Sequence, residues 1–232
     1  MRAPISIVIP TLDAAESLPE TVAPLIDAVT EGAVRDLVIS DGGSEDQTSA
    51  IAERLGATIV TGPKGRGGQI ARGIEAAGAP WLLILHADTQ LSPDWLAAVM
   101  DHMEYHPDKA GWFRLRFRAC GVAPRIVETG ANLRARFLGL PYGDQALFVH
   151  RDTLTEVGGM PTLPLMEDVA LARRLKGRLR PLDAEASTSA DRYLAEGWTV
   201  RTVRNLANLT RYLFGAEPET LAARYDAGMN AK

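Results

Sequence analysis

The chain has 232 residues, of which 46% are hydrophobic and 23% are charged, and its 25 basic and 29 acidic residues give a net charge of −4. These proportions are those of an ordinary soluble globular protein, and they exclude disordered, collagen-like and low-complexity chains. The lack of a basic excess argues against a general nucleic-acid binder, so we expect no nucleic-acid partner.

The cysteine content, the apolar runs and the first residues bear on the compartment. Cys120 is the only cysteine and cannot form an internal disulfide, so nothing indicates an oxidising compartment. The longest apolar run near the middle of the chain, residues 81–85, is far shorter than the ~20 residues of a membrane-spanning helix. The start of the chain reaches Pro10 too early for the apolar core of a signal peptide. We therefore expect a cytoplasmic protein.

Short apolar strands alternate with segments of helical periodicity in the first half of the chain. The predicted strands are residues 5–9, 34–40, 57–60 and 81–86. Helices are predicted to open at two capping boxes, to run over about residues 69–77, and to open again at residues 92–93. The capping boxes pair Ser17 with Glu20 and Ser44 with Gln47. Continuous apolar strands joined by helices indicate a doubly wound α/β fold with a parallel sheet covered on both faces.

Three aspartates follow predicted strands of this sheet. Asp13, Asp41 and Asp88 each come just after the carboxyl end of a strand. Ligands of open α/β sheets bind outside the carboxyl ends of the strands, so we expect these carboxylates to line one edge.

The second half is less regular. Residues 112–118 alternate strictly, with Phe113, Leu115 and Phe117 on one face and three arginines on the other, and we expect this strand to be antiparallel to the first sheet. A helix over residues 122–138, a turn at 139–143, a buried strand at 144–150 and a helix over 167–175 follow, and residues 198–227 are predicted to form one or two closing helices. No repeat or long polar linker divides the chain, which indicates one domain.

Two groups near strand ends have side chains suited to bind a ligand. Asp41 is followed by two glycines that let the backbone approach a ligand, although the same residue could simply cap the next helix. His86 and Asp88 lie on the same side after a strand, and a carboxylate there suits Mg²⁺ or Mn²⁺, with His86 as a neighbour or additional ligand. A structural loop cap remains the alternative for Asp88.

The loop over residues 64–68 is rich in glycine and carries two cations. Its free N–H groups together with Lys64 and Arg66 suit a phosphate, although such a loop can also be a flexible connection. It lacks the spacing of a Walker A loop, and no Gly-x-Gly-x-x-Gly fingerprint follows the first strand. An acidic sheet edge beside a basic glycine loop indicates metal-assisted binding of a diphosphate, because a divalent cation would separate the like charges.

Taken in order, six short motifs resemble those of the family 2 glycosyltransferases. They are Ile-Val-Ile-Pro-Thr-Leu-Asp (7–13), Ser-Asp-Gly-Gly-Ser (40–44), Pro-Lys-Gly-Arg-Gly (63–67), His-Ala-Asp (86–88), Gly-Asp-Gln-Ala (143–146) and Met-Glu-Asp-Val (166–169). The resemblance covers roughly residues 4–214. The sequences of three of these segments most resemble those of a bacterial subgroup labelled arsenosugar-biosynthesis glycosyltransferase.

The resemblance implies a GT-A fold, which is a Rossmann-like, mostly parallel mixed sheet flanked by helices, in a single domain over residues 1–232. Residues 1–110 would bind the nucleotide sugar, and residues 111–232 would form the acceptor side. The implied reaction is an inverting transfer of a hexosyl or related sugar from a nucleoside diphosphate sugar to an acceptor hydroxyl group, with Asp168 as general base. The resemblance implies Glu167 and Asp168 as catalytic residues and Asp88 as the ligand of Mg²⁺ or Mn²⁺. The residues implied to bind the nucleotide sugar are Pro10, Thr11, Asp13, Asp41, Lys64, Arg66, Gly67, Gln69, His86 and Asp88. The residues implied on the acceptor side are Tyr142, Gly143, Asp144 and Gln145.

The chain departs from the family pattern at three places. His86 stands where many relatives have aspartate, and no histidine follows His150 to complete a metal site, which leaves Asp88, phosphate and water as ligands. The Gln-x-x-Arg-Trp signature of processive synthases is absent, which favours a single-addition transferase.

The charge is distributed unevenly between the halves. Residues 1–110 hold 7 basic and 16 acidic residues, a net charge of −9, whereas residues 111–232 hold 18 basic and 13 acidic residues, a net charge of +5. Arginines of the second half could meet an anionic acceptor, either a small molecule or a lipid-linked one. The apolar face predicted over residues 198–214 fits a basic helix lying on anionic lipid, so peripheral membrane contact is one interpretation, and a helix packed on its own domain is the other.

Two other functions fit parts of the pattern. A nucleotidyltransferase shares the sheet and the metal chemistry, but it would favour a glycine-rich signature after the first strand, where residues 10–13 have none. A non-catalytic nucleotide-sugar-binding protein is the second alternative, and the Glu167–Asp168 pair argues against it. The pattern indicates no oligomeric state.

Overall fold

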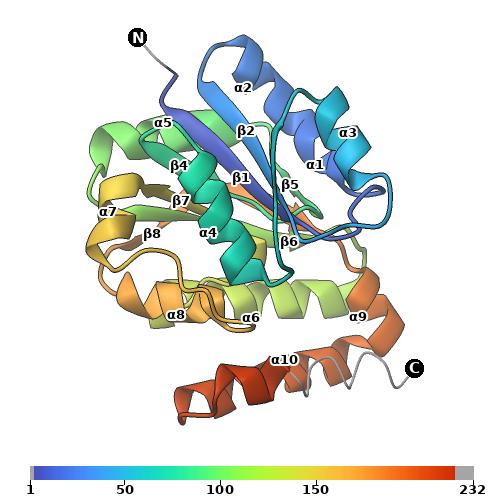
Figure 1. Ribbon diagram of the computed structural model, residues 1–232. Helices are drawn as coiled ribbons and strands as arrows, with labels where there is room; N and C mark the ends of the chain where they lie inside the picture. The colour runs from blue at the N-terminus through green and yellow to red at the C-terminus, as the bar shows by residue number, and fades with distance from the viewer. Residues whose placement is uncertain (1–2, 223–232) are drawn as a thin grey trace.

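A computed structural model describes residues 3–222 of the chain, which form one eight-stranded sheet with helices on both faces (Figure 1). The strand order is β3-β2-β1-β4-β7-β6-β8-β5. The strands are β1 (Ile5–Thr11), β2 (Val34–Asp41), β3 (Thr58–Thr61), β4 (Trp81–Ile84), β5 (Thr89–Leu91), β6 (Ala110–Phe117), β7 (Leu147–His150) and β8 (Leu179–Thr188).

The helices alternate with the strands over most of the described chain. They are α1 (Leu18–Val22), the 3₁₀ helix η1 (Ala23–Leu25), α2 (Ile26–Thr30), α3 (Thr48–Arg54), α4 (Arg66–Ala76), α5 (Trp95–Tyr105), α6 (Val122–Leu138), the 3₁₀ helix η2 (Gly143–Gln145), α7 (Arg151–Glu156), α8 (Glu167–Arg174), α9 (Asp191–Glu196) and α10 (Trp198–Leu213).

The parallel sheet predicted for the first half is confirmed. Strand β1 pairs in parallel with β2 and β4, and β2 pairs in parallel with β3. Side chains of β1 alternate between two buried clusters, because Ile7 packs under α1 and α5 whereas Val8 packs under α4 and α8. A strand buried on both faces needs apolar residues at every position, which is why the central strands read as continuous apolar runs.

The predicted direction of residues 112–118 is wrong. Strand β6 pairs antiparallel with β7 and parallel with β8, and β7 is itself antiparallel to β4. Strand β6 therefore runs in the same direction as the first sheet, and the short strand β7 between them is reversed. The alternation of Phe113 and Arg114 reports which face is buried and carries no information on direction.

Neither capping box forms. Ser17 is the N-cap of α1, but its hydroxyl donates to the carbonyl of Ala14 and makes no capping bond, and Glu20 accepts a 3.0 Å hydrogen bond from Gln90 Nε2. Ser44 donates to the buried carboxylate of Asp41, and α3 begins only at Thr48. In both cases a partner distant in the sequence or buried in the sheet outcompetes the local cap.

The strand predicted over residues 144–150 is shorter. Residues 143–145 form η2, because the side-chain oxygen of Gln145 accepts a hydrogen bond from the N–H of Tyr142 and closes a tight turn. Ala146 follows with a left-handed φ of 48°, so β7 starts at Leu147.

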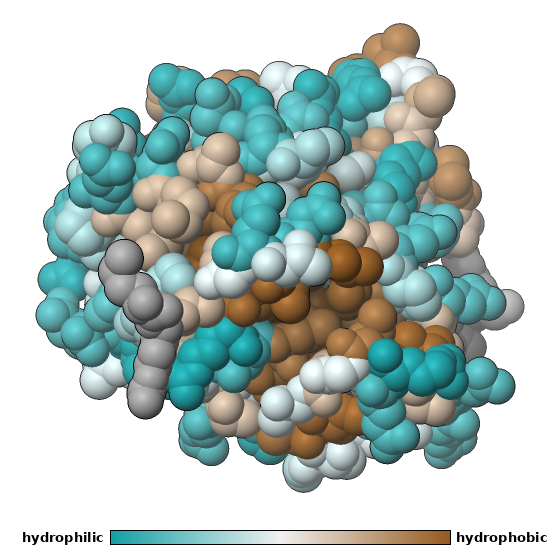
Figure 2. Space-filling model, turned by 90° about the horizontal axis from the view of Figure 1, so that it is seen from above, coloured by the Kyte–Doolittle hydropathy of each residue, from teal (hydrophilic) through white to brown (hydrophobic). Residues whose placement is uncertain are grey.

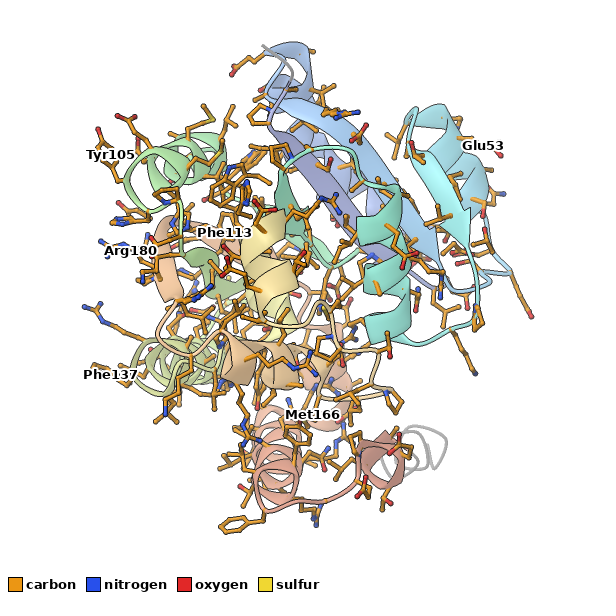
Figure 3. All side chains as sticks on the ribbon, turned by 60° about the vertical axis from the view of Figure 1, so that its left-hand side comes forward. Glu53, Tyr105, Phe113, Phe137, Met166 and Arg180 are labelled. Atoms are coloured by element: carbon orange, nitrogen blue, oxygen red, sulfur yellow. The ribbon has the colours of Figure 1, made fainter. Side chains whose placement is uncertain are left out.

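The closing helices form a separate layer below the sheet (Figures 1 and 3). Helix α10 packs against the rest through Trp198 and Leu209, whereas Val203, Leu206 and Phe214 are exposed. Of the stretch predicted to be helical, residues 223–227 lie outside the described residues. At the opposite end of the molecule, Figure 2 shows hydrophobic residues gathered over the middle of the face, within a hydrophilic rim.

Candidate functional site

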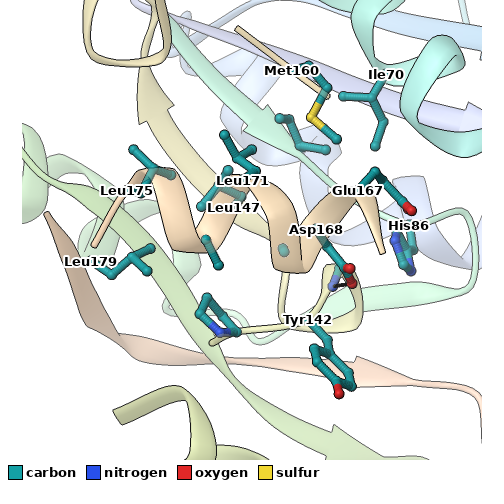
Figure 4. Close-up of a pocket in the computed structure, with 15 residues that line it drawn as sticks. Ile70, His86, Tyr142, Leu147, Met160, Glu167, Asp168, Leu171, Leu175 and Leu179 are labelled. Carbon is teal, nitrogen blue, oxygen red and sulfur yellow. Dashed lines mark hydrogen bonds between the residues drawn. The ribbon is translucent and has the colours of Figure 1, made fainter. Parts of the chain in front are cut away.

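A cavity lies along α8, beside the carboxyl end of β4 and the start of β7. Figure 4 shows His86, Glu167, Asp168 and Tyr142 at one end of this cavity and aliphatic side chains at the other. Glu167 and Asp168 come from α8, His86 follows β4, and Tyr142 precedes η2. The aliphatic lining consists of Ile70, Ile84, Leu147, Leu171, Leu175 and Leu179, with Met160. Predicted site residues from three separate segments of the chain therefore meet at this cavity.

Asp168 is held in place by two backbone N–H groups. One carboxylate oxygen accepts from Gly143 at 2.8 Å, and the other accepts from Val169 at 2.7 Å. As predicted, Asp168 lies in the first turn of a helix, where the unpaired N–H groups and the helix dipole stabilise negative charge. The carboxylate is thus fixed while its remaining lone pairs stay available to a ligand.

The glycine at residue 143 allows the close approach of η2 to His86. A Cβ atom at this position would lie 2.4 Å from His86 Nε2 and 3.6 Å from Asp168 Oδ2. Burial lowers the pKa of His86, and the positive charge of Arg66 lowers it further, so the imidazole is neutral near pH 7. A neutral imidazole can donate one hydrogen bond and accept another, without adding charge to the site.

Glu167 joins α8 to the glycine-rich loop. Its side chain is 2% exposed, and Oε1 lies 3.5 Å from Arg66 Nη1. Burial raises the pKa of Glu167, and the neighbouring Asp168 raises it further, whereas Arg66 opposes the shift. The two adjacent carboxyl groups thus differ in their surroundings: Asp168 has backbone donors, while Glu167 depends on one cation.

Asp144 is a half-buried carboxyl group in this region. Its Oδ1 is inaccessible and has no hydrogen-bond partner. Burial raises the pKa of Asp144 to about 6, with Asp168 and Asp88 adding to the effect and Arg134 opposing it. These electrostatic partners place Asp144 among the acidic groups of the site.

Arg134 of α6 clamps the loop that carries the acceptor-side candidates. Its guanidinium carbon lies 3.4 Å from the centre of the Tyr142 ring, and its side chain donates to the carbonyl of Leu140 and to Gln145 Oε1. Burial raises the pKa of Tyr142 to about 12. Arg134 was expected only as one of the arginines that could meet an anionic acceptor or a membrane surface; its contact with Tyr142 was not predicted, because it depends on the turn at Gly139, where φ is 64°.

Three of the described residues other than glycine have a left-handed φ, and each is a predicted site residue or the sequence neighbour of one. Within residues 3–222 they are Asp13, Ala146 and Met166, with φ values of 49°, 48° and 64°. Such conformations are costly for residues with a Cβ atom, and they cluster at functional sites. Met166 directly precedes Glu167, and Ala146 lies between Gln145 and Leu147, so two of these strained positions border the cavity.

Asp41 forms a second polar cluster, at the ends of β1 and β2. Its carboxylate is 2% exposed and accepts from the Thr11 hydroxyl at 3.0 Å, from the Gly43 N–H at 2.9 Å, and from the Ser44 N–H and hydroxyl at 2.8 and 2.5 Å. Burial opposes ionisation, but the bonds from Ser44, Thr11 and Gly43 together lower the pKa of Asp41. The carboxylate therefore orders the loop that follows β2.

Asp13 crosslinks the loops after β1 and β2. Its N–H donates to the Ser44 hydroxyl at 2.8 Å, and its Oδ1 accepts from the Glu45 N–H at 2.9 Å. Pro10 and Thr11 end β1 opposite Ser40 and Asp41, as expected from parallel strands. Two of the three predicted aspartates thus lie at the edge formed by β1 and β2.

Gln69 ties this edge to the glycine-rich loop. Its Nε2 donates to the carbonyls of Thr11 at 2.6 Å and Ser40 at 3.1 Å, and its Oε1 accepts from the Gly65 N–H at 3.1 Å. Gly67 is buried in α4, and a Cβ atom there would lie 2.3 Å from the carbonyl oxygen of Pro161. Lys64 is exposed on the same loop.

The arrangement suits a divalent cation only if the ligand supplies most of its oxygens. Across residues 3–222, no three His, Cys, Asp or Glu side chains come together in a group that could hold a metal ion. The carboxylate of Asp88 accepts long hydrogen bonds from the hydroxyls of Thr89 at 3.3 Å and Thr188 at 3.5 Å. Magnesium is often held by one or two carboxylates plus substrate phosphates, and Asp88 fits that mode.

Comparison with known proteins identifies relatives of this fold. Residues 6–151 match the family model described as "Glycosyl transferase family 2". No curated protein matches the chain.

Solved structures share the fold at low sequence identity. TarS from S. aureus superposes with a TM-score of 0.63 and 16% identity over 80% of this chain and 36% of the TarS chain. Glucosyl-3-phosphoglycerate synthase from Mycobacterium tuberculosis, in complex with Mn²⁺, uridine diphosphate and glucosyl-3-phosphoglycerate, gives a TM-score of 0.58 and 18% identity over 80% of this chain and 70% of that chain. The present chain thus spans about a third of TarS. The mostly parallel mixed sheet flanked by helices is the GT-A fold.

Proposed function

Because the chain belongs to glycosyl transferase family 2, we propose that it transfers a sugar from a nucleoside diphosphate sugar to an acceptor hydroxyl group. We propose an inverting reaction in which Asp168 is the general base. The observation that carries this assignment is the carboxylate of Asp168 at the mouth of the cavity, fixed by the N–H groups of Gly143 and Val169.

In the proposed reaction, the acceptor hydroxyl attacks the anomeric carbon while the nucleoside diphosphate leaves from the opposite face. The hydroxyl proton passes to a carboxylate oxygen of Asp168, which must be within hydrogen-bond reach of that hydroxyl. Two N–H donors orient Asp168 for this transfer. Glu167 contributes negative charge only when ionised, and its burial keeps it protonated over a wider pH range than an exposed glutamate.

The donor would bind along the edge formed by β1, β2 and the glycine-rich loop. Thr11, Asp13 and Asp41 would face the nucleoside, with Ser44 exchanging its bonds to Asp41 for bonds to the ligand. Lys64, Arg66 and the N-terminus of α4 at Gly67 would meet the diphosphate, and His86 would lie beside it. Pro10 and Gln69 would act by positioning these loops.

A divalent cation, Mg²⁺ or Mn²⁺, would be held by Asp88 together with oxygens of the diphosphate. Such an ion supplies positive charge where negative charge develops on the leaving diphosphate. Two solved neighbours support the kind of donor and cofactor to be tested: TarS residues 1–349 are known in complex with UDP-GlcNAc, and the mycobacterial synthase in complex with Mn²⁺ and UDP-glucose.

The acceptor would enter from the side formed by the second half of the chain, residues 111–232. Tyr142, Gly143, Asp144 and Gln145 lie on the loop between α6 and β7, and Gly143 contacts both His86 and Asp168. The loop is clamped by Arg134, so its position relative to Asp168 is defined.

Thermal denaturation with UDP, GDP, ADP, CDP and dTDP, each with and without Mn²⁺, tests the donor assignment. A ligand that binds only the folded state raises the melting temperature by mass action. We expect one nucleoside diphosphate to stabilise the protein more than the others, and more strongly with Mn²⁺. Equal, negligible shifts with all five nucleotides would contradict the proposed function.

A further inference from the structure

We propose that α6 and α10 form a surface that docks on an anionic phospholipid membrane. The two helices pack against each other below the sheet, through a shared cluster that contains Ala131 of α6 and Trp198 of α10 (Figures 1 and 3). The proposal concerns where the protein resides and does not depend on the reaction that it catalyses.

Helix α10 turns an apolar stripe away from the protein. Its buried residues are Arg201, Asn208 and Leu209, whereas Val200, Val203 and Leu206 on the opposite side are about 60% exposed, with Leu213 and Phe214 continuing the stripe at 45% and 88%. The spacing of three and four residues places these side chains on one face. An amphipathic helix of a globular protein normally buries its apolar face, whereas α10 exposes this apolar stripe.

Helix α6 has a second exposed stripe. Its buried face consists of Pro124, Glu128, Ala131 and Ala135. The opposite face carries Val122, Ile126, Leu133 and Phe137, exposed by 75%, 67%, 50% and 73%. Figure 3 shows Phe137 pointing away from the body of the protein. Two neighbouring helices thus both expose apolar side chains that a monomer in water would be expected to bury.

The charges on these helices identify the partner. Helices α6 and α10 contain six arginines and a single acidic residue, Glu128, which is buried under Arg116 and Arg125. Arg201 and Arg204 pair with Glu196 of α9, and Arg134 lies over the Tyr142 ring, so these three do not flank the apolar stripes. Arg136 and Arg211 are exposed. An apolar stripe flanked by arginines is the pattern of a helix lying in the interface of an anionic bilayer.

Two other arrangements fit less well. A symmetric dimer through this surface would bring the arginines of one copy against those of the other, which is unfavourable. Within residues 3–222, no helix has the length and apolar character needed to cross a bilayer. The helices would instead lie parallel to the membrane plane. The exposed apolar side chains would then insert into the bilayer, and the arginines would lie near the lipid phosphates.

Co-sedimentation with lipid vesicles tests the proposal. We expect the protein to bind vesicles that contain phosphatidylglycerol, to bind those of phosphatidylcholine alone much more weakly, and to dissociate as salt is raised. The double variant Val203→Gln/Leu206→Gln should bind phosphatidylglycerol vesicles about tenfold more weakly, because two inserted aliphatic side chains are lost. The matched control, Ile26→Gln/Val29→Gln, removes two half-exposed aliphatic side chains from α2 and should bind as the parent does.

Two outcomes would overturn the proposal. One is equal binding of the parent and the Val203→Gln/Leu206→Gln variant to phosphatidylglycerol vesicles. The other is a parent that sediments as a dimer while this variant sediments as a folded monomer, which would assign the surface to a second copy. Circular dichroism and nucleotide-induced stabilisation of each variant establish that it is folded, and they separate failure of this proposal from failure of the proposed function.

Discussion

The N–H of Gly143 donates a 2.8 Å hydrogen bond to the carboxylate of Asp168, which ties the loop before β7 to the first turn of α8. The same glycine lies against the imidazole of His86, where a Cβ atom would come within 2.4 Å of Nε2. One backbone position therefore sets the distance between the proposed general base and the end of β4.

The substitution Asp168→Asn should abolish transfer while nucleotide binding and folding remain. Asparagine keeps an oxygen that can accept from Gly143, but it cannot take up the acceptor proton at neutral pH. We expect the turnover rate to fall about 10²–10⁴-fold, the usual contribution of a positioned general base. The measurements are product formation and calorimetric titration with the nucleotide. The control is Asp101→Asn, which changes an exposed aspartate on α5 and should keep full turnover. Full turnover in Asp168→Asn would exclude Asp168 as the general base.

The substitution Gly143→Ala should lower both stability and turnover. The added methyl group meets His86 at a distance that no real Cβ contact shows, so the imidazole or the loop must shift. We expect a loss of about 1–3 kcal/mol in the free energy of unfolding, typical of overpacking. The measurement is urea denaturation, followed by turnover under conditions where the variant is folded.

Gly130→Ala is the matched control for Gly143→Ala. Gly130 lies inside α6 with open space where its Cβ would be. Alanine favours a helix over glycine by about 0.5–1 kcal/mol, so this variant should gain stability. If the two variants changed stability alike, the packing of Gly143 against His86 would not be the cause.

Much of the first half could be predicted, because strands buried on both faces leave a direct mark in the sequence. The run at residues 81–85 is one such strand, and β4 within it pairs in parallel with β1, as predicted. Strand β8 left no such mark. Leu182, Ala184 and Ala186 do alternate with polar residues, but two of these three inward residues are small and Pro181 precedes them, so the strand has no continuous apolar run.

The site was predictable only where its residues are local. Glu167 and Asp168 open a helix, and that placement follows from their sequence context. The clamp formed by Arg134 over Tyr142 does not, because it requires α6 to end at a left-handed Gly139 and the chain to return beneath the helix. Likewise Ser44, expected to cap α3, binds Asp41 because a buried carboxylate competes more strongly for its hydroxyl.

The substitution Asp88→Asn should remove the effect of Mn²⁺ on nucleotide binding. An amide is a much poorer ligand for a hard cation than a carboxylate, and Asp88 is the carboxylate proposed to hold it. We expect the Mn²⁺-dependent part of the nucleotide-induced rise in melting temperature to disappear, with little change in stability without ligand. Asp94→Asn, outside the site, should respond to Mn²⁺ as the parent does. If Asp88→Asn kept the Mn²⁺ effect, Asp88 would not be the metal ligand.

The substitution Gln69→Leu should weaken both the fold and nucleotide binding. It removes the amide that joins the carbonyls of Thr11 and Ser40 to the N–H of Gly65, and it leaves buried polar groups with fewer partners. We expect a loss of about 1–3 kcal/mol in the free energy of unfolding. Gln90→Leu breaks only an exposed hydrogen bond to Glu20, so chemical denaturation should show a change below about 0.5 kcal/mol. Equal losses in both variants would argue against a special role for Gln69.

The substitution Asp144→Asn should change how stability depends on pH. Burial raises the pKa of Asp144 from 3.8 to about 6, so between these values the folded protein binds more protons than the unfolded chain. Stability therefore falls as pH rises through this window, and the loss is complete above pH 6. Asparagine carries no charge at any pH, so the variant should exceed the parent above pH 6 by up to about 3 kcal/mol and differ little near pH 4. Urea denaturation of both proteins between pH 4 and pH 8 measures the difference, and a gain that is the same at every pH would show that ionisation of Asp144 is not its cause.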